Sequence, residues 1–163
     1  MKAIIAGTFD PFTVGHRDIT ERALAVFGSA IIAVADDTGK NSLPLADRLE
    51  IAERSVDGLS NITVEPFSGL LSEYLSAHGD CVLVRGIRNT RDAEYERDIS
   101  RVYASLCGKE TVFFVTRAEY EHVSSSVVRE LAKLGAELDG YVVSSARQYI
   151  ENKYAAKAKR SAI

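Results

Sequence analysis

The segment of residues 7–16 reads Gly-Thr-Phe-Asp-Pro-Phe-Thr-Val-Gly-His and combines hydroxyl groups, glycines and an imidazole. It follows the apolar residues 3–6 directly and leads into a stretch with helical periodicity. A phosphate group can bind backbone N–H groups and the positive end of a helix at such a strand-to-helix junction. We therefore single out His16, at the opening of the helix, as a candidate donor to an anion. A capping or surface role is the alternative for a histidine in isolation.

A second polar segment follows the apolar residues 81–84. In it Arg85 and Arg88 flank Gly86 and Ile87. Arginine presents fork-shaped donors that suit phosphate oxygens, and glycine allows the backbone to approach a ligand closely. A solvated basic loop, balanced by the acidic residues that follow, is the alternative, and we favour it for Arg91.

Two further groups of residues could contact phosphate. Ser124, Ser125 and Ser126 precede an apolar helical stretch. One serine would serve as a helix cap, whereas three in a row add donors at a positive helix end that suit a triphosphate. Lys40 lies in a predicted turn after the second apolar run, and a solvated loop charge is its alternative role.

Short apolar runs alternate with helical patterns along the whole chain. The predicted strands are residues 2–6, 30–35, 62–65, 81–84 and 111–115. The predicted helices are residues 15–27, 45–56, 70–77, 92–106, 124–134 and 144–154. The fourth helix shows the clearest amphipathic pattern, formed by Tyr95, Ile99, Val102, Tyr103 and Leu106.

This alternation predicts an α/β fold, a doubly wound sheet of five parallel strands with helices on both faces. All the polar segments follow predicted strands. Because ligands bind beyond the carboxyl ends of parallel strands, we expect these segments to form one site.

The composition indicates an ordinary globular protein. The 163 residues fit one domain, with a basic tail from about residue 155 that we expect to fray, and 46% of them are hydrophobic. A net charge of −3 argues against a general nucleic-acid surface, and no apolar run reaches the length of a membrane span. Cys81 and Cys107 form no C-x-x-C pair, and we expect reduced thiols in a cytoplasmic protein.

Several other chemistries lack their motifs. The three histidines and two cysteines show no metal-ligand spacing, so we assign no metal ligand to the protein. No G-x-S-x-G elbow, G-x-G-x-x-G fingerprint or Walker A sequence is present.

Three motifs together resemble the bacterial phosphopantetheine adenylyltransferases, which belong to a nucleotidyltransferase superfamily with a T-x-G-H core. The first, G-T-F-D-P-x-T-x-G-H, is matched throughout by residues 7–16. The second, R-G-[LI]-R-x-x-x-D-[FY]-E-Y-E, is matched by residues 85–96 except at Ala93. The third, S-S-S-x-V-[KR]-E, is matched by residues 124–130. Each motif alone is shared or degenerate, but their order and spacing are specific.

The resemblance implies a Rossmann-like enzyme that transfers AMP from ATP to 4′-phosphopantetheine. The products would be dephospho-coenzyme A and pyrophosphate, in a step of coenzyme A biosynthesis. It also implies a homohexamer and coenzyme A as a feedback ligand. We expect Mg²⁺ as the cofactor because bridging phosphate charge is its usual role. A sister enzyme acting on nicotinamide mononucleotide or a polyol phosphate is the alternative. A non-catalytic nucleotide-binding module is a second alternative.

The resemblance further assigns roles to individual residues. His16 would stabilise the transition state, with Lys40 and Thr8 beside it. Substrate-binding residues would be Thr8, Lys40, Leu71 and Arg85, with core packing as the alternative for Leu71. ATP-binding residues would be Thr8, Phe9, His16, Gly86, Ile87, Arg88, Glu96, Tyr120, Glu121, His122, Val123, Ser124, Ser125 and Ser126. The loop after Lys40 is one residue shorter than is common in the family.

Overall fold

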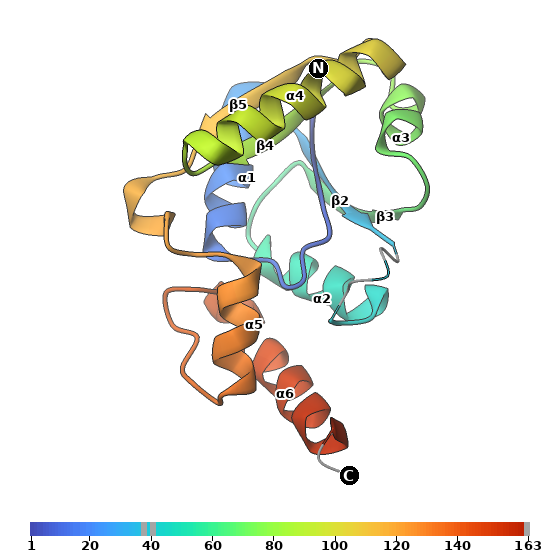
Figure 1. The fold of residues 1–163 in the computed structure, drawn as a ribbon. Coiled ribbons are helices and arrows are strands. Elements are labelled where there is room, and N and C mark those ends of the chain that lie inside the picture. Colours follow the sequence, from blue (N-terminus) through green and yellow to red (C-terminus); the bar gives the residue numbers. More distant parts are fainter. Residues whose placement is uncertain (37–38, 40–41, 162–163) are drawn as a thin grey trace.

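The computed structural model of the chain describes residues 1–36, 39 and 42–161. Within them five strands form one parallel sheet in the order β3-β2-β1-β4-β5 (Figure 1). The strands are β1 (Lys2–Gly7), β2 (Ala30–Ala35), β3 (Ile62–Phe67), β4 (Cys81–Ile87) and β5 (Thr111–Val115). The order reverses between β1 and β4, so the predicted doubly wound α/β sheet is confirmed.

Three strands extend beyond the apolar runs that predicted them. In β4, the continuation includes Arg85 and reaches Ile87, because these residues pair in register with Phe113 and Val115 of β5. The ladder bonds come from the backbone, so a polar side chain does not end a strand. The side chain of Arg85 therefore projects from a strand of the sheet. This corrects the prediction that Arg85 lies in a loop after the strand.

In the described residues, six α-helices and one short 3₁₀ helix lie between the strands and after the last of them. The α-helices are α1 (Val14–Phe27), α2 (Leu45–Ser55), α3 (Leu71–Ala77), α4 (Thr90–Cys107), α5 (Ser125–Lys133) and α6 (Ser144–Ser161). The 3₁₀ helix η1 (Ala118–Tyr120) was not predicted, and α6 continues beyond the end predicted at residue 154. Helix α1 ends at Gly28, whose φ of 75° lies in the left-handed region that favours glycine.

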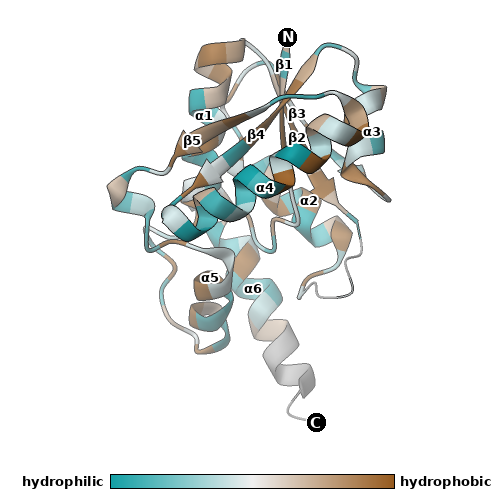
Figure 2. Ribbon diagram, turned by 45° about the horizontal axis from the view of Figure 1, so that its top comes forward, coloured by the Kyte–Doolittle hydropathy of each residue, from teal (hydrophilic) through white to brown (hydrophobic). Residues whose placement is uncertain are grey.

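Helices cover both faces of the sheet because successive strand residues point to opposite sides. On one face Ala3 and Ile5 of β1 belong to a core with residues of α1, α2, α5 and α6. On the other face Ile4 and Ala6 pack with Leu75 of α3 and with partly buried residues of α4. Figure 2 shows largely hydrophobic strands among helices in which hydrophilic and hydrophobic residues are mixed.

Helix α4 differs from its predicted packing. The helix is present, but Tyr95, Val102 and Leu106 are 63%, 49% and 63% exposed. The inward-facing side is formed by Tyr103 and Cys107, which pack on the sheet, and by the buried Glu96. The predicted apolar stripe is therefore divided between the core and the outer surface.

Helices α5 and α6 lie beyond the carboxyl ends of the strands (Figure 1), where they pack against each other, and α6 also packs on α2. They add a wall to the edge of the sheet at which ligands are expected. In the described residues no helix is both long and apolar enough to cross a membrane. Cys81 is buried, Cys107 is half-buried, and both thiols are free.

Candidate active site

A cavity of about 620 Å³ opens at the carboxyl ends of β1 and β4. Its walls come from β1 and the loop after it, the first turns of α1 and α4, the end of β4 and the segment from Thr116 to Ser126. The cavity therefore lies where the strand order reverses, which is the position at which open α/β sheets bind ligands.

Most of the predicted site residues line this one cavity. They are Thr8, Phe9, His16, Arg85, Gly86, Arg88, Glu96, Tyr120, Val123, Ser124, Ser125 and Ser126. These residues come from three of the four polar segments that we expected to meet at one edge of the sheet. The fourth segment is the one that contains Lys40.

Four other predicted residues lie outside the cavity lining. Ile87 is the last residue of β4, and Glu121 and His122 are exposed. The ring of His122 meets that of Tyr141 edge-on, with 5.5 Å between centroids, which accounts for its position without a ligand. Leu71 begins α3 and packs against the core of the sheet, as the alternative role for it required. Lys40, also proposed for the site, lies outside the described residues.

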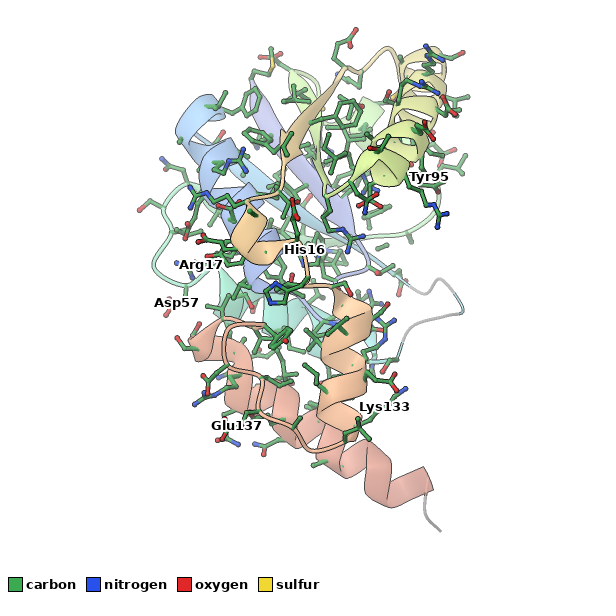
Figure 3. All side chains as sticks on the ribbon, turned by 60° about the vertical axis from the view of Figure 1, so that its left-hand side comes forward. His16, Arg17, Asp57, Tyr95, Lys133 and Glu137 are labelled. Atoms are coloured by element: carbon green, nitrogen blue, oxygen red, sulfur yellow. The ribbon has the colours of Figure 1, made fainter. Side chains whose placement is uncertain are left out.

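His16 is the third residue of α1 and takes part in its N-terminal cap. The backbone N–H of Thr13 donates to Nδ1 of His16 at 3.0 Å, and the N–H of His16 donates to Oγ1 of Thr13 at 3.4 Å. Because Nδ1 accepts a hydrogen bond, the neutral imidazole carries its proton on Nε2. Within the described chain Nε2 has no partner. Figure 3 shows His16 near the middle of the molecule, while the adjacent Arg17 points away toward Asp57.

The surroundings of His16 keep its ring neutral. Its centroid lies 5.1 Å from that of Phe9 and 5.2 Å from that of Phe12. Burial, followed by the positive charges of Arg88 and Arg85, lowers the pKa of His16 from 6.5 to about 4. The side chain therefore offers a neutral N–H donor at neutral pH.

The loop after β1 is shaped by close ring packing. Phe9 is 4% exposed, and its backbone has a φ of 46°, a region that non-glycine residues rarely adopt. A Cβ on Gly7 would lie 3.2 Å from the Phe9 ring. The glycine therefore leaves room for the ring beside His16, and the packed ring holds the strained backbone in place.

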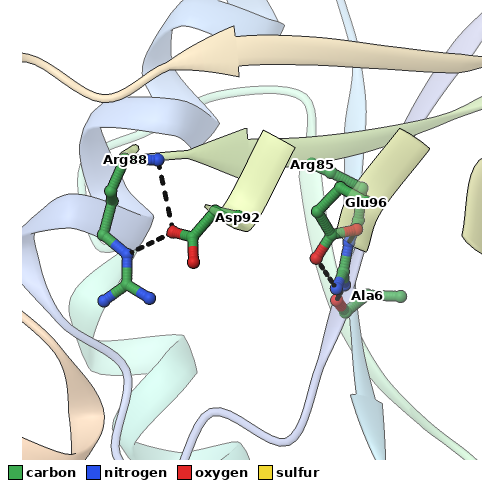
Figure 4. A network of polar contacts seen from close by, with 5 residues as sticks. All are labelled: Ala6, Arg85, Arg88, Asp92 and Glu96. Atoms are coloured by element: carbon green, nitrogen blue, oxygen red, sulfur yellow. Dashed lines mark hydrogen bonds and ion pairs between the residues drawn. The ribbon is translucent and has the colours of Figure 1, made fainter. Parts of the chain in front are cut away.

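Arg85 and Glu96 form a two-pronged ion pair at the back of the cavity (Figure 4). Nε and Nη2 of Arg85 donate to the two carboxylate oxygens of Glu96 at 2.8 and 2.6 Å. Nη1 donates to the carbonyl of Ala6 at 2.8 Å. Burial favours the neutral form of Arg85, but the contacts with Glu96 outweigh it, so its pKa is raised. The guanidinium is thus held rigidly, with further N–H groups left to bind an anion.

Arg88 is anchored more lightly. Its Nε donates to Oδ2 of Asp92 at 2.9 Å, and its backbone N–H reaches the same oxygen at 3.3 Å (Figure 4). Neither terminal nitrogen of the guanidinium has a partner among the residues that the structure describes. The side chain is 40% exposed, so these donors are available to a ligand in the cavity.

The serines at the start of α5 divide their tasks. Ser124 caps the helix by accepting from the N–H of Val127 at 3.2 Å, and Ser125 donates to the carbonyl of Pro11 at 2.8 Å. Oγ of Ser126 accepts from Arg129 at 3.0 Å. The N–H groups of Ser125 and Ser126 have no acceptor within the described chain, and both residues line the cavity. Two helix N-termini, those of α1 and α5, therefore converge on it.

The sequence analysis missed several residues that build the site. Two of them line the cavity: Thr116, which is 8% exposed, and Tyr95, which is 63% exposed. Asp18, only 4% exposed, pairs with Arg117 at 3.0 Å and with Arg22 at 3.2 Å. It thereby ties α1 to the segment that carries Tyr120 into the cavity. An aspartate two residues after His16 was the available signal, but its partner is distant in sequence.

The described side chains do not form a metal site. They contain no cluster of three or more His, Cys, Asp or Glu that could hold a metal ion. The acidic residues of the cavity, Asp92 and Glu96, are each paired with an arginine. A divalent ion in this cavity would be held mainly by phosphate oxygens of a bound nucleotide and by water.

Comparison with known proteins identifies the class of this fold and site. Residues 4–131 match the family model described as cytidylyltransferase-like, so the protein is a nucleotidyltransferase by fold. A phosphopantetheine adenylyltransferase of Corynebacterium efficiens is 36% identical over 156 residues, covering 94% of this chain and 98% of the relative. Those of Oenococcus oeni and Geotalea daltonii are 36% and 35% identical, over 94% and 93% of this chain and 98% and 96% of theirs. The chain belongs to the phosphopantetheine adenylyltransferase family.

Proposed function

We propose that this protein transfers AMP from ATP to 4′-phosphopantetheine, giving dephospho-coenzyme A and pyrophosphate. One observation carries the proposal: a neutral imidazole N–H, two helix N-termini and two arginines converge on one cavity at the switch point of the sheet. Such a set of donors suits a triphosphate that must stay bound while one of its bonds breaks.

The reaction needs no nucleophile from the protein. A phosphate oxygen of 4′-phosphopantetheine forms a bond to the α-phosphorus of ATP. The bond between that phosphorus and the α,β-bridging oxygen breaks, and its electron pair leaves with pyrophosphate. Catalysis then consists of positioning the two substrates and stabilising charge as it develops.

The N–H donors without a partner in the described residues suggest where ATP would bind in the cavity. Nε2–H of His16 would face the α-phosphoryl group, where negative charge increases in the transition state. Arg88 and the N–H groups of Ser125 and Ser126 would hold the β- and γ-phosphates. Tyr120, half-buried at the rim, would lie beside the adenine.

The acceptor side rests on fewer contacts. Arg85, with donors left over from its pair with Glu96, would bind the phosphate of 4′-phosphopantetheine, and Thr8 would contact both substrates. In this arrangement Glu96 orients Arg85, in addition to the nucleotide contact that the family resemblance assigns to it. The roles assigned to Lys40 and Leu71 stay predictions.

Mg²⁺ enters this scheme with the nucleotide. Since the carboxylates of the cavity are paired with arginines, the ion would arrive as the magnesium complex of ATP and neutralise part of the phosphate charge.

A homohexamer is the proposed assembly. The exposed apolar side chains Tyr95, Val102 and Leu106 along α4, with Val115 on the edge strand β5, support burial of this surface between subunits. Coenzyme A as a feedback ligand and a cytoplasmic location also stay predictions.

A coupled assay for pyrophosphate tests the proposed activity. The protein is mixed with Mg·ATP and, separately, with 4′-phosphopantetheine, nicotinamide mononucleotide and a polyol phosphate. The proposal is supported if pyrophosphate is released with Mg·ATP and 4′-phosphopantetheine but not with either of the other two acceptors. Release with another acceptor identifies a sister enzyme, and nucleotide binding without release with any acceptor identifies a binding module.

A further inference from the structure

Arg48, in the first turn of α2, is 1% exposed, yet the mechanism above does not use it. Nη1 donates to the carbonyls of Thr8 at 2.8 Å and Ala35 at 2.6 Å. Nη2 donates to the carbonyl of Asp36 at 3.1 Å, and Nε to that of Leu43 at 3.1 Å. A buried cation is costly unless it is hydrogen-bonded. These carbonyls come from the loop after β1, from the end of β2 with the residue after it, and from the entry to α2. One side chain thus fixes three segments behind the cavity.

The bond to Thr8 determines the orientation of a peptide group in the site. The peptide bond between Thr8 and Phe9 is trans, since among the described residues only Asp10–Pro11 is cis. In a trans peptide the C=O and N–H groups point in opposite directions. Because Arg48 holds the Thr8 carbonyl, the N–H of Phe9 faces away from Arg48. That N–H has no acceptor in the described part of the chain, and both residues line the cavity.

The same peptide lies beside a strained residue. Phe9 has its φ at 46°, and such a conformation persists only where its surroundings hold it. The ring of Phe9 is held by Phe12 and His16 on the side-chain side. Arg48 restrains the backbone of the same loop, because it binds the carbonyl of Thr8, the residue before Phe9.

We propose that Arg48 is a positioning residue for adenylyl transfer. By binding the carbonyl of Thr8 it aims the N–H of Phe9 at the transferring phosphoryl group, next to Nε2 of His16. It contacts neither substrate. The inference rests on the proposed function, since it assigns the Phe9 N–H to the reacting phosphorus.

The test compares Arg48→Lys and Arg48→Met with Arg54→Met as a matched control. Arg54 lies on the same helix, but its side chain is 46% exposed and pairs with Glu50, away from the cavity. We expect kcat to fall about 100-fold in Arg48→Met and about 10-fold in Arg48→Lys, because small displacements of catalytic donors reduce rates by such factors. The dissociation constant of ATP should change less than about threefold, since Arg88 and the serines of α5 do not contact Arg48. Arg54→Met should keep the kcat of the wild type.

The outcomes separate this inference from the proposed function. A wild-type protein that releases no pyrophosphate contradicts the function itself. If the wild type is active and Arg48→Lys keeps its kcat while only the melting temperature falls, Arg48 is merely structural and the inference is wrong. Should Arg48→Met fail to fold, Arg48→Lys decides the question, with kcat referred to the folded fraction measured by circular dichroism.

Discussion

The backbone N–H of Thr13 donates to Nδ1 of His16 across one turn of helix, and this 3.0 Å bond determines which imidazole nitrogen carries the proton. A capping box at the start of α1 therefore does two things: it caps the first turn of the helix and selects the tautomer that presents Nε2–H to the cavity. The cap of the helix and the donor that we propose for catalysis therefore belong to the same hydrogen-bonded turn.

Replacing Thr13 tests this link. Thr13→Val removes the hydroxyl that caps α1, and we expect a loss of about 1 kcal/mol in the free energy of unfolding. The turn that orients His16 also loosens, so kcat should fall about 10-fold. Urea denaturation and the pyrophosphate assay measure the two effects. Thr13→Ser keeps the hydroxyl and should resemble the wild type, whereas equal kcat in all three proteins would contradict the coupling.

The lowered pKa of His16 predicts how stability depends on pH. The unfolded chain binds a proton on this residue near pH 6.5 and the folded chain only near pH 4, so the unfolded state binds more protons in between. The contribution of His16 to the free energy of unfolding should therefore decrease as the pH falls from about 6.5 to about 4. His16→Gln keeps an acceptor for the cap but does not titrate. Its urea denaturation curves should show a smaller loss over this range, and identical pH dependence in both proteins would refute the assignment.

The lowered pKa of His16 also predicts how activity depends on pH. In the free enzyme His16 stays neutral above about pH 5, so its titration should cause no inflection in kcat/KM near pH 6.5. His16→Ala removes the imidazole donor and should lower kcat about 10²- to 10³-fold, as expected for loss of a preorganised donor, with ATP binding retained. A kcat unchanged by this substitution would rule out the proposed role.

Arg88 offers a test of the nucleotide side. Arg88→Met removes the free guanidinium donors, and loss of a charge-assisted hydrogen bond worth about 1.5–3 kcal/mol should weaken ATP binding about 10- to 100-fold. Arg91→Met is the control, because Arg91 is exposed and outside the cavity. Isothermal titration with ATP distinguishes them. Equal affinities for ATP in the two variants would show that Arg88 does not bind the phosphates.

The exposed apolar residues of α4 test the proposed assembly. Leu106→Glu places a charge on a side chain that is 63% exposed in one subunit, so it should dissociate an assembly that buries this surface. Leu134→Glu is the control, because Leu134 directly follows α5 and is 76% exposed. Light scattering after gel filtration gives the masses. A mass unchanged by Leu106→Glu would show that α4 is not buried between subunits.

The fold was largely predictable because its strands are apolar and its helices carry ordinary end signals. The predicted bounds of β2 and β5 agree with the structure, and Gly28 ends α1 as expected. The apolar pattern of α4 was misleading, since periodicity shows that a face is apolar but not what covers it.

The site was predictable where chemistry is local in sequence, as in residues 7–16. It was not predictable where a partner is remote. Asp18 depends on Arg117, and Arg48 depends on the carbonyl of Thr8, forty positions away along the chain. Carbonyl groups have no sequence signature, so a buried arginine that donates to backbone carbonyls resembles any charged residue of an amphipathic helix. The pairing of Arg85 with Glu96 spans a strand and a helix and was equally hidden.

The position of the cavity between β1 and β4 also affects how the protein matures. During synthesis residues 7–16 leave the ribosome well before Arg88 and the serines of α5, and β4 then pairs with the edge of β1 opposite β2. In the proposed mode of binding, a chain that ends before α5 lacks part of the donor set for a triphosphate. ATP at 100 times its dissociation constant would add about 2.7 kcal/mol to the stability of the folded state that binds it.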